Sequence, residues 1–387
     1  MARLTRGSDW AVWFSKQSAQ GAINATPAFT PVTRSSGKPK KTIGYVQDDT
    51  VTTDYNAAQN IQDTTELTAE IETSAAKQTI NFLISAIHGS ETAYTNTSTT
   101  YAALADGFTV TAGAYAALSV GDGFWVSGFA GATINGFYIV SSKETSNKVV
   151  TTIAPAATES AGASVTLVSN KTKNADTTSY YTLQRRVTDT GAGGTSYHTT
   201  YDHVIDTQSL TIGETGIIKS SIGFKGEQEV SGVSAISGQT NAAAPTDTIM
   251  SAVQNVLGFY VDGVSATCKV KSMTINVANG YQGDDAAGCQ KYYARGQFTV
   301  GGDIAVRSRI DAPLDWEAYY LAGTRKNIGI RLMHSSTEET FIVMRRNVIT
   351  EHNQEDAANV VSSHQMSFAA EGDSTTSSTI MIFKNWV

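Results

Sequence analysis

Only one segment of this 387-residue chain has the hydrophobic spacing of a long amphipathic helix. Within residues 75–88 the large apolar side chains recur at intervals of three and four, which places them on one stripe: Ile80, Leu83, Ile84 and Ile87. Ser74 is a suitable N-cap for this helix, and Gly89 is a suitable residue to end it. Because the stripe covers a single face, we expect the helix to lie across a sheet built by the rest of the chain.

The composition favours strands and turns for that remainder. The chain has 33 Gly and only 6 Pro, and 41% of its residues are hydrophobic, which is enough for a sizeable core. Charged residues make up 16% of the chain, against roughly 25% in an average soluble protein. A weakly charged exterior suits a protein whose surface is covered by copies of itself. An ordinary Thr/Ser-rich β protein would have the same composition, so both interpretations stay open.

The chain before the helix has two parts. Residues 1–60 contain aromatic anchors among Gly, Pro and Thr, and we expect an extended arm that lies on its own domain or on a neighbouring subunit: Trp10, Trp13, Phe14 and Phe29. Val46–Thr65 is polar and predicts a long loop. The strict alternation in Glu66–Glu72 then predicts a half-buried strand.

After the helix, turn residues separate several short strand patterns. They predict strands at 108–113, 122–129, 135–142, 147–153 and 163–169. We interpret residues 96–172 as an inserted small β-barrel or β-sandwich domain on the outer surface, which divides a larger domain into residues 1–95 and 173–387. Its expected core residues are Phe124, Val126, Phe137, Ile139, Val149 and Ile153.

The strand patterns resume near Tyr180. Residues 180–187 predict a strand, Thr188–His203 a flexible hinge or long hairpin tip, and Ser209–Val230 two strands around Gly213–Gly216. A short helix is expected at Ile249–Leu257. Further strands are predicted at Cys268–Val277 and 296–306, followed by a hairpin at 326–349 and a last strand that begins near His364.

No segment carries the pattern of a catalytic or metal site. His198, Asp202, His203 and Asp206 lie close together in sequence, but their spacing matches no zinc pattern, and we interpret them as polar loop residues. Other short patterns also lack the partners that their chemistry needs, namely Asp48-Asp49, Asp284-Asp285 and the Gly191–Gly194 run. We therefore predict no catalytic residue, no metal and no cofactor.

Charge and cysteine usage exclude further classes. A net charge of −7 argues against a protein that grips nucleic acid, and the short basic runs at Lys38–Lys41 and Arg185-Arg186 read as solvated loop or strand ends. Cys268 and Cys289 are too few for a disulfide framework, so two unpaired thiols are expected. Without a signal-peptide pattern or a long apolar run, we expect the protein to be made in a cytoplasm.

One aromatic group could bind a ligand. Trp316, Tyr319 and Tyr320 are close enough in sequence to stack on a sugar or a base, although packing in a core or an interface explains them better.

The order of several segments resembles the tail tube protein, or major tail protein, of long-tailed, siphovirus-type bacteriophages. Before the final third of the chain the resemblance lies in ELTAEIETSAAKQTINFLISAIHG and GIIKSSIGFKGEQEV. In the final third it lies in VKSMTINVANG, GQFTVGGDIAV, YLAGTRKNIGIRL with its paired strand TFIVMRRNVITEH, and HQMSFAAEGD. The stretch VGDGFWVSGFAGATINGFYIVSS resembles a small β-module that interrupts some of these proteins. Where the family hairpin often turns on Asp-Gly, this chain has His334–Thr337.

The resemblance implies a fold and a function. The fold is a mainly β sandwich or split barrel with one flanking helix. Six copies form a ring, the rings stack into a hollow tube in the virion, and genomic DNA passes through the channel without specific binding. The implied partners are other copies, tail tip or baseplate proteins, a tail terminator, and a tape measure protein inside the lumen. Acidic side chains facing the lumen would repel phosphate, but the lumen-lining residues are unknown from sequence.

A second interpretation belongs to another class. The chain could be a β-rich decoration or receptor-binding protein of the virion, with the inserted domain as the binder. A hydrolase with an unrecognised site is the third. Hollow tubes or hexameric rings in electron micrographs would favour the first interpretation, whereas a soluble monomer or trimer that binds cells or glycans would favour the second.

Overall fold

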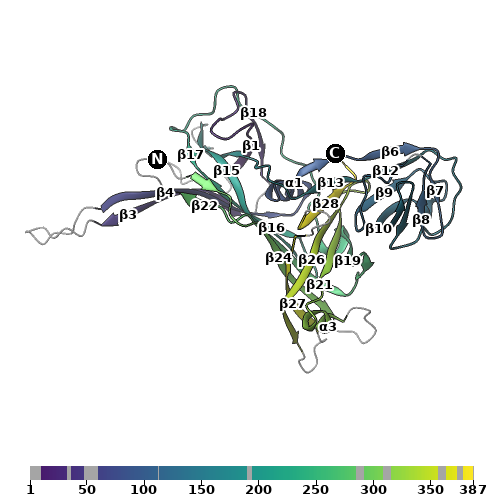
Figure 1. Ribbon diagram of the computed structural model, residues 1–387. Coiled ribbons are helices and arrows are strands. Elements are labelled where there is room, and N and C mark those ends of the chain that lie inside the picture. Colours follow the sequence, from purple (N-terminus) through teal and green to yellow (C-terminus); the bar gives the residue numbers. More distant parts are fainter. Residues whose placement is uncertain are drawn as a thin grey trace, which may run out of the picture.

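The computed structural model describes residues 10–32, 36–47, 60–111, 113–189, 194–284, 292–307, 315–355, 363–372 and 378–386. In these residues the protein is mainly β, with a nineteen-stranded sheet, a separate seven-stranded sheet and a two-stranded ribbon (Figure 1). The ribbon pairs β22 (Gln282–Asp284) with β23 (Tyr292–Ala294). The mainly β fold class expected from the composition is confirmed.

The large sheet folds back on itself, and its principal part is eight strands wide. These strands lie in the order β3 (Ser36–Gln47), β4 (Asn60–Ser74), β16 (Lys219–Gly226), β15 (Gly194–Ile212), β21 (Val270–Ala278), β24 (Thr299–Arg307), β27 (Ser363–Ala370) and the second half of β26 (Glu339–Glu355). Every neighbouring pair is antiparallel, so one side of this principal sheet can be apolar and the other polar.

Strand β26 carries the large sheet into its second layer. Its second half pairs with β27, whereas its first half pairs with β25 and β28. The bend falls at Arg346, whose φ of 47° is a left-handed conformation. The second layer contains β20 (Val264–Ser265), β19 (Val256–Val261), β25 (Lys326–Met333), β26, β28 (Ile380–Lys384), β13 (Asn170–Lys173) and β5 (Ser90–Thr92).

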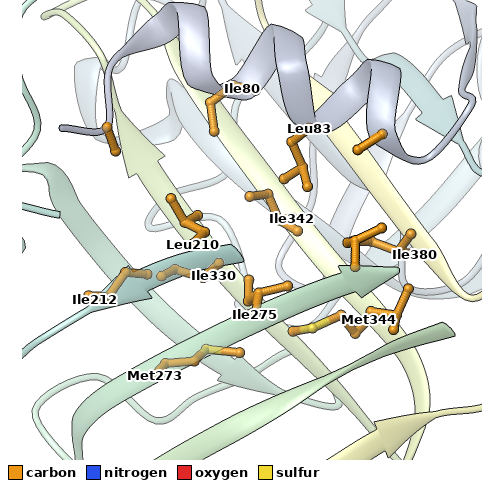
Figure 2. Packing of buried hydrophobic residues seen from close by; sticks show 14 of the residues in the cluster. Ile80, Leu83, Leu210, Ile212, Met273, Ile275, Ile330, Ile342, Met344 and Ile380 are labelled. Atoms are coloured by element: carbon orange, nitrogen blue, oxygen red, sulfur yellow. The ribbon is translucent and has the colours of Figure 1, made fainter. Parts of the chain in front are cut away.

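The core lies between these layers and under helix α1 (Lys77–Ala86). Figure 2 shows Ile80 and Leu83 of α1 above the apolar side chains of β15, β21, β25, β26 and β28. The residues labelled on these strands are almost completely buried: Leu210, Ile212, Met273, Ile275, Ile330, Ile342, Met344 and Ile380. The expected helix across a sheet is therefore present, and it starts and ends two residues inside the predicted range.

The predicted N-cap is wrong, whereas Gly89 does lie at the end of the helix. Ser74 is the last residue of β4, and the N-cap is Ala76, whose backbone N–H donates to Thr79 Oγ1 at 3.2 Å. At the other end His88, with φ 52°, takes the left-handed position, while the Gly89 N–H donates to the Ile84 carbonyl at 3.1 Å. Gly89 is needed because a Cβ there would lie 2.2 Å from the methyl group of Thr172 in β13.

The N-terminal arm is more regular than the sequence predicts. Its strand β1 (Trp10–Lys16) pairs with β14 (Tyr181–Asp189), which in turn pairs with β15, and β2 (Ala28–Pro31) pairs with β1. Strand β18 (Thr240–Asn241) pairs with β2, and β17 (Gln228–Glu229) pairs with β15. The described part of the arm thus lies on its own chain. The predicted loop Val46–Thr65 begins and ends inside the β3–β4 hairpin, and its residues 48–59 lie outside the described ones.

The predicted hinge Thr188–His203 is wrong for its described residues. Thr188 and Asp189 end β14, and from Gly194 onward the segment is strand β15, which continues without interruption to Ile212. The Gly- and Thr-rich composition suggested mobility, but pairing with β14 on one side supplies the backbone hydrogen bonds that make a strand. The hairpin interpretation agrees with this pairing, and its tip at 190–193 lies outside the described residues.

The seven-stranded sheet, residues 95–168, is called the inserted module here, and the remainder is called the body. Its order is β6 (Thr95–Ser98), β12 (Val165–Val168), β9 (Gly123–Ser127), β10 (Gly136–Thr145), β11 (Lys148–Thr151), β8 (Gly107–Thr109) and β7 (Ala102–Ala103). Five of these correspond to predicted strands, while β6 and β7 were missed because their Thr-, Asn- and Ala-rich sequences lack alternation. The division into 1–95, 96–172 and 173–387 stays a prediction, and β13 at its second boundary pairs with body strands.

The module has a hydrophobic cluster of its own, but the predicted core list is only partly right. Phe124, Val126 and Val149 belong to that cluster. Phe137 and Ile139 instead contact the body, and Ile153 is 53% exposed. The remaining helices are short: α2 (Ala252–Asn255) covers the middle of the predicted 249–257 helix, and α3 (Trp316–Leu321) contains the aromatic residues Trp316, Tyr319 and Tyr320. A 3-10 turn (Ala132–Ile134) lies within the module.

Candidate assembly surfaces

One side of the principal sheet is polar in each of its strands. The register aligns Thr211, Thr274, Asp303, Ser367 and Glu351 in one row across β15, β21, β24, β27 and β26. The next row contains Ser209, Asn276, Gly301 and Ala369. Because side chains alternate along a strand, the residues next to those in these rows, such as Ile275, Ile304 and Met366, point into the core. The outward side chains of β21, β24, β27 and the second half of β26 are called the polar face below.

The polar face is acidic at its centre. Asp303 and Glu351 are exposed, and Asp303 Oδ1 accepts a hydrogen bond from Ser367 Oγ at 2.7 Å. A shallow hollow of about 300 Å³ opens between them. Its lining contains no Lys or Arg among the described residues: Ser272, Thr274, Asp303, Ile304, Ala305, Glu351, Asn353, Gln365, Met366 and Ser367. Because no Lys or Arg of the described chain lines the hollow, its two carboxylates give it a negative potential.

The other end of the principal sheet has mixed charge. On the same side, Lys38 of β3 lies opposite Glu70 of β4, and Lys40 lies opposite Thr68. The β3–β4 hairpin extends well beyond the rest of the molecule, at the left of Figure 1. Lys41 ties its base to β17 through an ion pair with Glu229 at 2.8 Å. The β3–β4 hairpin therefore exposes backbone hydrogen-bonding groups and charged side chains that a neighbouring molecule could contact.

Two groups of apolar side chains are exposed away from the polar face. Ile217 pairs with the segment that leads into α2, where Ile249 is 45% and Val253 71% exposed. On α3, Leu321 is 75% and Tyr320 38% exposed. Exposed apolar groups of this kind on a folded chain are typical of protein contact sites.

The predicted polar loop at 198–206 is a strand whose side chains have structural roles. Asp202 accepts hydrogen bonds from Gln17 Nε2 at 2.8 Å and from the Gly21 N–H at 2.9 Å, so it holds the loop after β1. Asp206 pairs with Lys225 at 3.0 Å. His203 is fully buried, and burial lowers its pKa to about 3. Within the described residues no three His, Cys, Asp or Glu side chains gather as metal ligands would.

The other sequence candidates are also accounted for. Trp316 is buried in the core, and Tyr320 stacks on His352 with ring centroids 5.8 Å apart. Cys268 is an exposed free thiol in a turn just before β21, so the predicted strand starts two residues later than expected. Arg186 is buried among aromatic rings, with its guanidinium 3.9 Å from the Trp13 ring. Cys289, Asp48 and Asp49 lie outside the described residues, as do Gly191 and Asp285.

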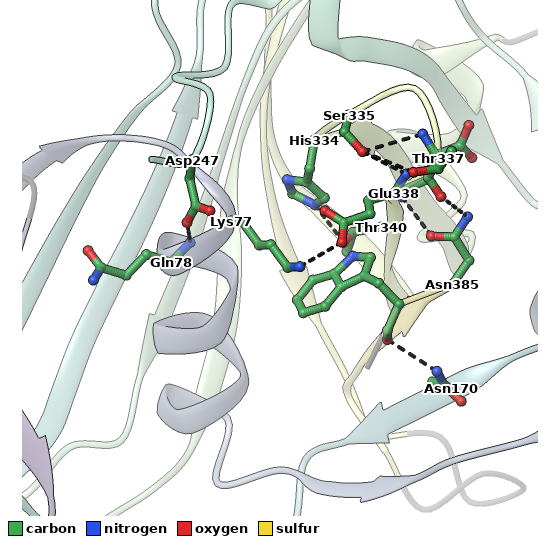
Figure 3. A network of polar contacts seen from close by, with 12 residues as sticks. Lys77, Gln78, Asn170, Asp247, His334, Ser335, Thr337, Glu338, Thr340 and Asn385 are labelled. Atoms are coloured by element: carbon green, nitrogen blue, oxygen red, sulfur yellow. Dashed lines mark hydrogen bonds and ion pairs between the residues drawn. The ribbon is translucent and has the colours of Figure 1, made fainter. Parts of the chain in front are cut away.

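The C-terminal end forms a polar clasp over α1 that sequence reasoning missed. Figure 3 shows Lys77 of α1 paired with Glu338 at 2.8 Å. The ring of Trp386 lies between Lys77 and Lys384, each with its ammonium group 4.3 Å from the ring centroid. The turn at His334 is part of this clasp, because the buried His334 ring lies against the Trp386 ring. Its Nε2 contacts Thr340 Oγ1 at 2.8 Å.

Comparison with protein families is decisive for the identity of the chain. The family model for phage tail tube proteins matches residues 7–380. The chain belongs to the phage tail tube protein family. It is thus a structural, non-enzymatic protein of the virion tail, as its sequence predicted. A search among curated proteins found no match, and in the described residues no helix is long and apolar enough to cross a membrane.

Proposed function

We propose that six copies of this tail tube protein form a ring, that the rings stack into the hollow tail tube, and that DNA leaves the capsid through its channel. The family match over residues 7–380 carries this proposal. The structure supports it with a sheet that is polar on one side and has its core on the other. In such an assembly, each contact joins two different surfaces of neighbouring copies. Contacts of this head-to-tail kind within a ring close it, and those between rings let the stack grow without limit.

The polar face is our candidate for the channel wall. Its strands are hydrogen-bonded to one another, and the outward side chains of its central row are polar: Thr274, Asp303, Ser367 and Glu351. Asp303 and Glu351 would face the DNA, where like charge prevents phosphate from adhering and favours sliding. The protein then guides DNA without gripping it.

The projecting elements are our candidates for contacts between copies. The β3–β4 hairpin projects beyond the rest of the molecule, and the exposed apolar groups near α2 and on α3 would be covered by neighbours. Tail tip or baseplate proteins and a terminator would cap the two ends of the tube, and a tape measure protein would occupy the lumen before ejection. Synthesis in the bacterial cytoplasm precedes assembly in this scheme.

Negative-stain electron microscopy of the purified protein at high concentration tests the assembly. We expect hollow tubes or six-membered rings. A monomer or trimer that binds host cells and never forms rings, even with the tail tip proteins present, would instead support a decoration or receptor-binding role.

The channel wall has a separate test. The double variant Asp303→Asn, Glu351→Gln should still form tubes, but phage carrying it should eject DNA more slowly because the repulsion of phosphate is lost. Glu144→Gln is a matched control, since this exposed glutamate lies on the inserted module. Equal ejection rates for the double variant, the control and the wild type would remove the polar face from the channel.

A further inference from the structure

We propose that the inserted module is locked to the body in one orientation by a buried ionic cluster centred on Asp122, so that the module and the body move as a single rigid unit. This inference goes beyond the proposed function and does not depend on it. An insertion with its own sheet and core could equally well be a tethered decoration, and the contacts at the junction decide between the two.

Asp122 stands just before β9 of the module and is completely buried. Its Oδ1 pairs with Arg345 of β26 at 3.2 Å, and its Oδ2 pairs with Lys171 of β13 at 2.8 Å. Oδ2 also accepts the Ser119 N–H at 3.0 Å. Both cationic partners belong to the body, so one module carboxylate is held by two different body strands.

Arg345 reaches into the module rather than toward solvent. Its side chain is only 3% exposed, and its Nη1 donates to the Val120 carbonyl at 3.3 Å. A Cβ at Gly121 would lie 2.3 Å from that same nitrogen, so the module backbone passes directly against the guanidinium. Removing one partner of a buried ion pair strongly lowers the free energy of unfolding, because the other charge stays buried without its counter-ion.

A second polar contact joins the module to the body within β9. Trp125 Nε1 donates to Glu339 Oε2 at 2.6 Å. The same carboxylate is gripped in fork fashion by Arg331, with Nε at 2.8 Å and Nη2 at 2.9 Å. The Arg331 guanidinium in turn lies 4.7 Å from the ring centroid of Phe137 in the module. Glu339 and Arg331 are thus fixed to each other and enclosed by two module aromatics.

Apolar packing fills the space between these polar contacts. A separate hydrophobic cluster joins module residues to body residues: Trp125, Phe137 and Ile139 on one side, and Tyr260, Phe341, Val343, Met381 and Phe383 on the other. The Phe137 ring lies 5.0 Å from that of Phe341 and 6.0 Å from that of Tyr260. A Cβ at Gly123 would be 2.8 Å from Phe341, which shows how closely the two surfaces fit.

The connections to the module are stiff as well. The chain enters after β5 and leaves into β13, and these two strands pair with each other, with Lys171 opposite Thr92. Strand β13 also pairs with β28 of the body. The entry and exit segments therefore form part of the large sheet, and neither is a free linker about which the module could swing.

Spin-label distance measurements on the full chain test the proposal. With both native cysteines replaced by serine, labels at Thr99 in the module and Glu70 in β4 should give a single narrow distance distribution. These two side chains are exposed and lie outside the junction. A broad distribution in the otherwise unchanged protein would overturn the proposal at once.

The role of Asp122 is tested with Asp122→Asn in the labelled protein. We expect a broadened distribution and at least a tenfold faster amide exchange in residues 119–125 and β28, while exchange in β8 and β11 stays slow because the module core is intact. Asp106→Asn is the matched control, since Asp106 also pairs with a lysine but lies exposed within the module. A distribution as narrow as that of the control would show that Asp122 does not hold the junction.

Trp125→Phe provides a second variant if Asp122→Asn fails to fold. It keeps an aromatic ring and removes only the hydrogen bond to Glu339. The proposal expects partial broadening and faster exchange at the junction. Unchanged distance and exchange in this variant would show that the second contact does not contribute to the lock.

Discussion

At the scale of single residues, the side chains that tie the molecule together are buried polar and aromatic groups. Trp386 shows this well, because it is 7% exposed and contacts α1, β13 and β28 near the end of the chain. Its ring packs between two lysines, and its carbonyl accepts a hydrogen bond from Asn170 Nδ2 at 3.1 Å. One side chain therefore joins the helix to the second layer.

Replacing this tryptophan should be strongly destabilising. We expect Trp386→Ala to lower the free energy of unfolding by about 3–4 kcal/mol, because it removes a large buried ring and two cation–π contacts. Chemical denaturation followed by circular dichroism measures the loss. Tyr292→Ala is a suitable control, since Tyr292 is 53% exposed. A loss for Trp386→Ala no larger than that for the control would contradict the clasp in Figure 3.

At the scale of elements, pairing partners decide what a segment becomes. Thr188–His203 has the composition of a hinge, yet Thr199 and Thr200 are buried in β15, and Gln184 of β14 donates to Thr199 Oγ1 at 3.0 Å. Strand β14 in turn carries β1. The segment thus holds the N-terminal strands to the rest of the chain.

Removing this segment should therefore unfold part of the molecule. Deleting Thr188–His203 takes away most of the pairing between β14 and β15, so we expect loss of a cooperative thermal transition as well as loss of tubes. Circular dichroism and differential scanning calorimetry report the first effect. A folded monomer after the deletion would show that the strand is dispensable and would restore the hinge interpretation.

At the scale of the whole molecule, buried histidines should set the lower pH limit of stability. Burial lowers the pKa of His203 to about 3 and those of His88 and His334 to about 4. The unfolded chain takes up these protons near pH 6.5, its ordinary histidine value. Stability should therefore be complete above pH 6.5 and should fall as the pH drops toward 4, by up to about 1.4 kcal/mol per histidine per pH unit.

Thermal unfolding between pH 4 and 8 tests whether stability falls on acidification, as expected. The melting temperature should be level above pH 6.5 and should decrease below it. In His203→Gln the slope between pH 4 and 6.5 should be smaller, even if the variant is less stable at pH 7. A wild-type melting temperature that rises on acidification would contradict the assignment of these side chains as neutral in the folded state.

Much of the fold follows from local sequence. The one amphipathic helix was placed within two residues at each end because Ile80, Leu83 and their neighbours repeat with the period of a helix. The final third was read correctly as strands, since β21, β24 and the β25–β26 hairpin alternate or carry β-branched residues. Strands without such patterns, such as β6 and β7, were missed.

The sequence by itself determined the class of the protein: a mainly β chain with one covering helix and no catalytic pattern, whose segments follow the order of a tail tube protein. Only the tertiary structure decided which side of the principal sheet is polar and how the module is held. Arg345 and Asp122 are 223 residues apart in the chain, so no local pattern marks them as partners. The polar face and the junction between module and body both depend on burial and strand register, which exist only once distant segments have paired.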